Sequence, residues 1–188
     1  MNKKLFLLVM VTMFVAVAYA QNGSFPTVLA ELMDKEHVAQ AKADIAAFRQ
    51  NEMENDEYLS EAELGFRCDT FAIEHFRVMR NDIDITDLGM RQTESACYDA
   101  YDALLNKYYK LLKSSLSEAD QAVLLKSQRS WLAYRDNEFD LVKLLNKDEY
   151  SGGGTISLLI AGCRETDIVK DRVLKLAWYW ISVSDMAE

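Results

Sequence analysis

The side chains that most often perform chemistry are scarce in this chain. Its two histidines, His37 and His75, lie in neither an H-E-x-x-H motif nor an E-x-x-H pair, the spacings that serve helical metal sites. No G-x-S-x-G motif supplies a serine nucleophile, and scattered carboxylates do not by themselves define an acid–base pair. We therefore predict no catalytic residue, no cofactor and no metal, and interpret the chain as a non-enzyme.

Three consecutive glycines, Gly152 to Gly154, form the one glycine-rich segment of the sequence. A phosphate-binding loop would need a following G-K-[ST] and a preceding strand, and the sequence shows neither. The glycines are therefore interpreted as a turn between helices.

The cysteines are Cys68, Cys97 and Cys163, an odd number. In an oxidising compartment one disulfide and one remaining thiol is the simplest pattern. The alternative is that all three are buried thiols that act as small apolar residues.

The first twenty residues have the features of a secretory signal peptide. A short basic start is followed by an apolar run at residues 5–17 and by the small-x-small site Ala18-Tyr19-Ala20. We expect cleavage following Ala20 and a periplasmic or secreted protein. The apolar run is shorter than the roughly 20 residues of a membrane-spanning helix, and Gln21 replaces the cysteine that lipid attachment needs. We expect no membrane anchor in the mature chain.

The mature chain is strongly acidic. The net charge of the whole sequence is -9, and removal of Lys3 and Lys4 lowers it to -11. Such a charge disfavours nucleic acid and anionic membranes, and it suits either solubility or a basic partner.

Helical patterning runs through the rest of the chain, which has one proline and few glycines. We predict an all-α fold: an antiparallel bundle of three long helices with two additional N-terminal helices. The N-terminal helical extension covers residues 21–86 and the bundle residues 87–188, packed as one domain. The predicted helices run from Pro26 to about Phe48, from Ser60 to about Arg80, from Thr86 to a turn near Leu116, from Glu118 to about Asn146, and from Thr155 to about Val183.

An amide and a guanidinium, Gln128 and Arg135, fall within the apolar stripe of the fourth helix. A buried guanidinium is costly unless it is paired. Residues at the same level of neighbouring antiparallel helices are the expected partners: Asn106 for Gln128, and Asp99, Asp102 or Asp167 for Arg135. Trp131 also lies one turn before Arg135, in position to stack on it.

The same levels predict one disulfide. Cys97 and Cys163 each lie about ten residues into helices that start at the same end of the bundle, roughly 15 Å along each axis. We therefore predict a Cys97–Cys163 bridge, with Cys68 unpaired.

Three segments together resemble a known family, the LprI-like lysozyme inhibitors of bacteria. They are "DLGMRQTESACYDAYDALLNKYYKLLKSSL", "LKSQRSWLAYRDNEF" and "GGGTISLLIAGCRETDIVKDRVLKL", within residues 87–176. The positions that match the family's motifs are Met90, Asp102, Leu105, Asn106, Tyr109, Gln128, Arg129, Trp131, Tyr134, Arg135, Asp136, Gly153, Gly154, Cys163 and, more loosely, Arg172.

The sequence departs from the family at two cysteine positions. The family opens with Met-x-x-Cys, whereas here Thr93 follows Met90 and the cysteine comes one turn later as Cys97. Phe139 stands where relatives usually carry a second cysteine. The family's disulfide pattern therefore does not transfer directly.

The resemblance implies an envelope or secreted protein that binds a basic hydrolase such as lysozyme by surface complementarity. The expected contacts are exposed polar and aromatic groups: Arg129, Asp136, Asp148, Glu149, Tyr150 and the acidic run 52–57. The alternative is a non-inhibitory envelope protein that binds another secreted partner or peptidoglycan.

Overall fold

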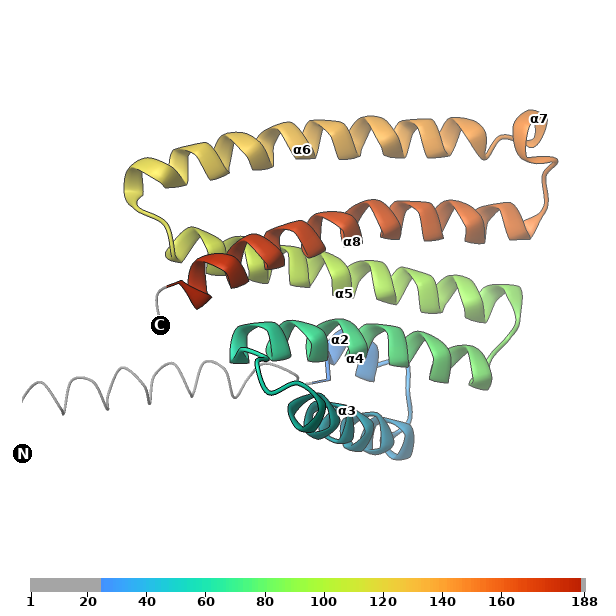
Figure 1. The fold of residues 1–188 in the computed structure, drawn as a ribbon. Helices are drawn as coiled ribbons and strands as arrows, with labels where there is room; N and C mark the ends of the chain where they lie inside the picture. The colour runs from blue at the N-terminus through green and yellow to red at the C-terminus, as the bar shows by residue number, and fades with distance from the viewer. Residues whose placement is uncertain (1–24, 187–188) are drawn as a thin grey trace, which may run out of the picture.

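The structure is a computed structural model that describes residues 25–186, and these residues are helical without a strand (Figure 1). The all-α prediction is thereby confirmed. The predicted signal peptide lies outside the described residues. The helices are α2 (Thr27–Ala30), α3 (Lys35–Asn55), α4 (Glu61–Ile83), α5 (Asp87–Ser114), α6 (Glu118–Leu145), α7 (Asp148–Ser151) and α8 (Thr155–Asp185).

The main core lies between α4, α5 and α8. The most extensive contact joins α5 to α8, and α4 packs against both of them. Fully buried side chains from all three helices meet there, including Phe76, Tyr101, Val173 and Leu176. Helix α3 covers the other side of α4, so the N-terminal helices continue the same packed body (Figure 1).

Helix α6 does not close a three-helix core, and here the structure differs from the predicted bundle. It lies along the outer edge of the molecule, packs on α8 and makes only sparse contact with α5 (Figure 1). Only Leu124, Gln128 and Val142 of its 28 residues are buried. The place predicted for α6 beside α5 and α8 is taken by α4, because α4 carries the broader apolar face.

Side-chain caps set three helix starts where the sequence predicts them. The hydroxyl oxygens of Ser60, Thr86 and Ser117 accept backbone N–H bonds at 3.2, 3.1 and 3.3 Å from residues three positions later. Each hydroxyl satisfies one of the N–H groups that a helix start leaves without a partner.

The first predicted helix is divided in two. The carboxylate of Asp34 accepts the N–H groups of Glu36 and His37 at 3.0 and 2.9 Å, and so caps a new helix, α3. Helix α2 ends before it, at Ala30. The apolar spacing predicted one continuous helix, but the Asp34 side chain starts a second helix within that segment.

The glycine segment turns the chain from α7 into α8. Gly152, Gly153 and Gly154 have φ values of 77°, 75° and 90°, a region that side chains other than hydrogen disfavour. Just after them the Thr155 hydroxyl donates to the Asp87 carboxylate and so joins the first turns of α8 and α5.

No helix within residues 25–186 is long and apolar enough to span a membrane.

Candidate functional site

Gln128 is an internal tie, as predicted, but its partner is Arg172 rather than Asn106. The Oε1 atom of Gln128 accepts from both Nε and Nη2 of Arg172 at 3.0 Å, and Ser127 Oγ accepts from Nη2 at 3.2 Å. Arg172 also lies over the Trp131 ring, 5.8 Å from its centre. These contacts hold α6 to α8.

The Arg172 guanidinium is buried without a carboxylate within ion-pair distance among the described residues, and only 8% of the residue is exposed. Burial lowers the pKa of Arg172, because water no longer stabilises the charged form. The Gln128 amide is therefore the main compensation for this buried charge. The sequence does indicate that Arg172 is buried, since it lies in the apolar stripe of Val169, Val173 and Leu176. The residue of α8 at the same level as Gln128 also lies within one turn of Arg172.

Arg135 is half-buried, and the carboxylates predicted for it are not its partners. Its Nη2 pairs with Asp136 Oδ1 at 2.6 Å, one residue along the same helix. Its guanidinium lies over the rings of Trp131 and Phe139, 5.6 Å from each centre, so the predicted stacking on Trp131 is confirmed. The prediction failed for Asp99 and Asp102 because α6 stands away from α5, and Asp167 of α8 is exposed and does not pair with Arg135.

The other predicted polar ties lie apart from Gln128. Asn106 donates to Asp102, four residues before it on α5, at 3.2 Å from the carboxylate and 2.9 Å from the carbonyl. Asp99 and Asp167 are exposed. The structure therefore joins Asp102 only to Asn106, and it brings Gln128 to Arg172 instead.

A half-buried ion network that sequence reasoning missed lies between α4, α5 and α8. Glu74 accepts from Lys170 at 2.7 Å, and Tyr101 and Arg77 also donate to it. Burial alone would raise the pKa of Glu74, but the bonds from Lys170 and Tyr101 and the charge of Arg77 outweigh burial and lower that pKa. Arg77 also pairs with Glu94 of α5 at 3.3 Å, so the network links α4 to α5 and, through Lys170, to α8.

The predicted Cys97–Cys163 disulfide is not formed in the structure, where Cys68, Cys97 and Cys163 are free thiols. Cys97 and Cys163 do share one neighbourhood, since the charges of Arg77 and Glu94 act on both thiols. Burial raises the pKa of Cys97 to about 12 and that of Cys163 to about 11.

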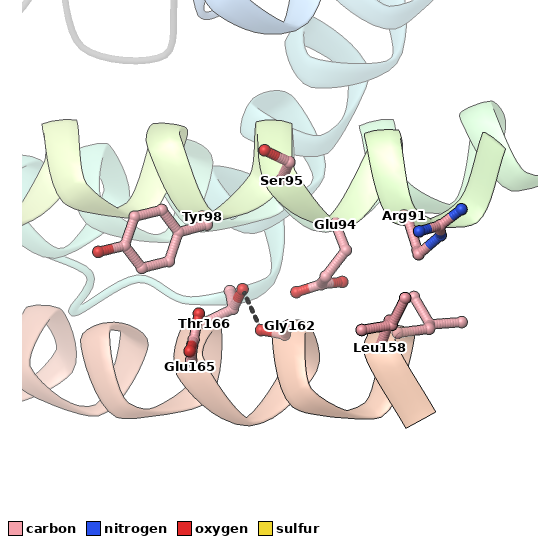
Figure 2. Close-up of a pocket in the computed structure, with 9 residues that line it drawn as sticks. Arg91, Glu94, Ser95, Tyr98, Leu158, Gly162, Glu165 and Thr166 are labelled. Atoms are coloured by element: carbon pink, nitrogen blue, oxygen red, sulfur yellow. Dashed lines mark hydrogen bonds between the residues drawn. The ribbon is translucent and has the colours of Figure 1, made fainter. Parts of the chain in front are cut away.

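A cleft of about 200 Å³ opens between the first halves of α5 and α8 (Figure 2). Figure 2 shows Arg91 and Leu158 at one end, Tyr98 at the other, and Glu94 between the two helices. The Glu94 carboxylate is paired with Arg77 of α4. The remaining lining mixes charge and apolar surface, which suits a side chain of a partner.

The predicted contact residues around the glycine turn are displayed. Asp148, Glu149 and Tyr150 are exposed, and Tyr150 lines a second cleft of about 340 Å³ with Ile156 and Arg164. On α6, Arg129 and Asp136 are also exposed, and the Asp136 carboxylate is engaged with Arg135. Within residues 25–186 no cluster of histidine, cysteine and acidic side chains is arranged to hold a metal ion.

The described residues thus form an all-helical protein with buried polar contacts between its helices and exposed charged side chains at the α7 turn. Comparison with known families gives a definite result: the model of the family "Lysozyme inhibitor LprI" matches residues 80–176. The chain belongs to the LprI lysozyme inhibitor family. The matched segment contains α5, α6, α7 and most of α8, and with them Gln128, Arg135 and Arg172.

A curated relative is an uncharacterized protein of Rhizobium meliloti (strain 1021). It is 32% identical over 79 residues, a match that covers 35% of this chain and 54% of the relative. The chain thus spans about half the length of that relative. No solved structure matches the chain.

Proposed function

We propose that this chain is a secreted or periplasmic, non-catalytic protein that binds a basic hydrolase such as lysozyme and inhibits it by covering its surface. The observation that carries the proposal is the family match over residues 80–176. Cleavage following Ala20 and export belong to the same proposal, supported by the basic, apolar and small-residue segments at the start of the sequence.

The charge distribution supports a basic partner. Residues 21–86 contain 14 acidic and 6 basic residues, whereas residues 87–188 contain 16 and 13. Most of the negative charge therefore lies in the N-terminal extension, beside the family segment. Its field would speed the approach of a basic protein, and salt would weaken the effect.

The α7 turn is the most suitable contact within the family segment. Asp148 and Glu149 are exposed in a short helix whose first turn points two carboxylates outward, and Tyr150 adds an aromatic ring that is 61% exposed. Aromatic groups beside charges are the usual anchors of protein interfaces. Tyr150 lines a cleft with Ile156 and Arg164 of α8, so the turn is placed against that helix before binding.

A lysozyme turbidity assay with the secreted protein tests the proposal. We expect slower clearing of bacterial cell walls, and we expect Asp148→Lys/Glu149→Lys to reduce the inhibition at least about tenfold. The control is Asp99→Lys/Asp171→Lys, which changes the charge equally at two exposed positions in the middle of long helices. If both double variants inhibit equally, the α7 turn is not part of the contact with lysozyme. If the wild-type protein does not inhibit, the proposed activity on that lysozyme is contradicted.

A further inference from the structure

Helix α6 carries a second stripe that its own fold leaves exposed. The first stripe, with Leu124, Gln128 and Val142, faces α8. The second recurs at alternating spacings of four and three residues, all of them exposed and uncharged: Val123, Ser127, Ser130, Tyr134, Asn137, Leu141 and Leu144. This spacing is the heptad seam along which helices pair.

The seam lies on the outer edge of the molecule. Figure 1 shows α6 beyond α8, with no other helix of residues 25–186 on its outer side. Val123, Tyr134 and Leu141 are 69%, 53% and 45% exposed, although α6 belongs to an otherwise well-packed chain. Apolar side chains displayed in a continuous row commonly mark a protein contact.

The seam is self-complementary when a second copy runs antiparallel to it. With a two-fold axis at the level of residue 132, Val123 lies opposite Leu141 of the other copy and Ser127 lies opposite Asn137. Ser130 lies opposite Tyr134, so a small side chain faces the largest one. Val123 and Leu141 thus meet at both ends of the paired stretch, Leu144 lies beyond it at the level of Asp120, and the polar centre meets itself, as a two-fold interface requires.

Charges beside the seam follow the same symmetry. Lys126 and Asp140 lie on the flank of the seam away from α8, and antiparallel pairing brings Lys126 of each copy near Asp140 of the other. Lys126 has no ion pair among the described residues, and Asp140 has one exposed contact, with Lys143 at 3.5 Å. Both groups are therefore available to a second copy.

The charge of α6 also favours a second copy over other partners. Its 28 residues contain 4 basic and 5 acidic side chains, in a chain of net charge -9. Two acidic copies repel each other unless they meet through a nearly neutral face, and α6 offers one. A strongly basic partner would instead be drawn to the acidic extension.

We propose that α6 is a homodimerisation helix that pairs antiparallel with α6 of a second copy through this seam. The acidic N-terminal helices lie on the opposite side of the molecule from α6 and so remain exposed in such a dimer (Figure 1). One helix pair with a polar centre is smaller than the standard interface of roughly 1,600 Å². The dimer should therefore be reversible and dependent on concentration.

Sedimentation velocity of the secreted protein, from low micromolar to near-millimolar concentration, tests the pairing. We expect a monomer–dimer equilibrium, and Leu141→Asp should raise the dimer Kd at least about tenfold because it places a carboxylate in the seam. Leu125→Asp is the matched control, since Leu125 is a similarly exposed leucine on the opposite flank of α6. A monomer at every concentration, or equal effects of the two variants, would overturn the proposal.

Charge exchange tests the antiparallel register. Lys126→Glu and Asp140→Lys should each weaken the dimer several-fold, because each creates like charges across the axis, and the double variant should restore the wild-type Kd. Circular dichroism of each variant reports whether the monomer remains folded. If the folded double variant stays as weak as the single variants, α6 does not pair in this register.

Discussion

Arg172 of α8 and Arg135 of α6 differ in burial, and this difference indicates which of them stabilises the fold. Arg172 is buried, bound to the Gln128 amide and to the ring of Trp131. Arg135 is half-buried and shares Asp136 with solvent. Arg172 is therefore the structural cation, although the sequence pattern directed attention to Arg135.

Gln128→Leu should destabilise the protein by about 2 kcal/mol, because it leaves the buried guanidinium of Arg172 without its main acceptor. Urea unfolding followed by circular dichroism measures the change. The double variant Gln128→Leu/Arg172→Met removes both partners and should recover most of the loss. If the double variant is as unstable as the sum of the single ones, the amide does not compensate the charge.

The thiols of the folded protein should react slowly at pH 8. Burial raises the pKa of Cys97 to about 12 and of Cys163 to about 11, so little thiolate exists at that pH. Alkylation in denaturant without reductant, followed by mass spectrometry, should modify all three cysteines. A peptide that links Cys97 to Cys163 would show instead that the disulfide predicted from the sequence does form.

Glu74 should contribute to the pH dependence of stability. Its pKa is lowered in the folded protein, so its contribution is complete above the unfolded value of about 4.5 and is lost as the pH falls through the folded value. Glu74→Gln should therefore destabilise at pH 7 and cost progressively less below pH 4.5, as measured by urea unfolding at each pH. Glu57→Gln, at an exposed carboxylate, should show neither effect. A cost of Glu74→Gln that is independent of pH would contradict the lowered pKa.

At the scale of elements, the sequence predicts helix starts better than it predicts helix neighbours. Ser60, Thr86 and Ser117 mark starts through local hydrogen bonds, which depend only on residues three positions away. Asp34 has the same local role and was missed because apolar spacing continued across it. Where a capping residue and apolar periodicity disagree, the capping residue is the better predictor of where a helix starts.

It was harder to predict which helices pack against each other, because this depends on which helix has the larger apolar face to bury in the core. We predicted Asn106 of α5 as the partner of Gln128, whereas its partner is Arg172 of α8, because level counting treats every helix of a bundle as equally close. Helix α4 packs against α5 and α8 and displaces α6 to the edge. Asp99 and Asp102 of α5 were therefore assigned to Arg135 across a gap that the sequence does not reveal.

Ser117→Ala should destabilise the protein by about 1 kcal/mol through loss of the α6 cap. Thermal unfolding measures this loss, and Ser130→Ala, at an exposed position in the middle of the same helix, is the control. If neither substitution changes the unfolding temperature, the Ser117 cap does not stabilise α6.

At the scale of the whole molecule, two kinds of surface are separated. The acidic extension and the α7 turn display charge, and α6 displays a nearly neutral seam. The first suits a basic hydrolase and the second suits another copy of the chain. The family segment at residues 80–176 contains both the α7 turn and α6, so both surfaces stand on the same four helices.

Binding of the secreted protein to a basic lysozyme across a salt series tests the proposed function most directly. We expect saturable binding that blocks cell-wall clearing and whose Kd rises steadily with ionic strength, because acidic surface steers and holds the basic enzyme. Asp148→Lys/Glu149→Lys should make the Kd depend less on salt. Asp99→Lys/Asp171→Lys should reduce the salt dependence of the Kd by a smaller amount. Absence of binding at low salt, with the protein folded, would contradict the assignment of lysozyme as its partner.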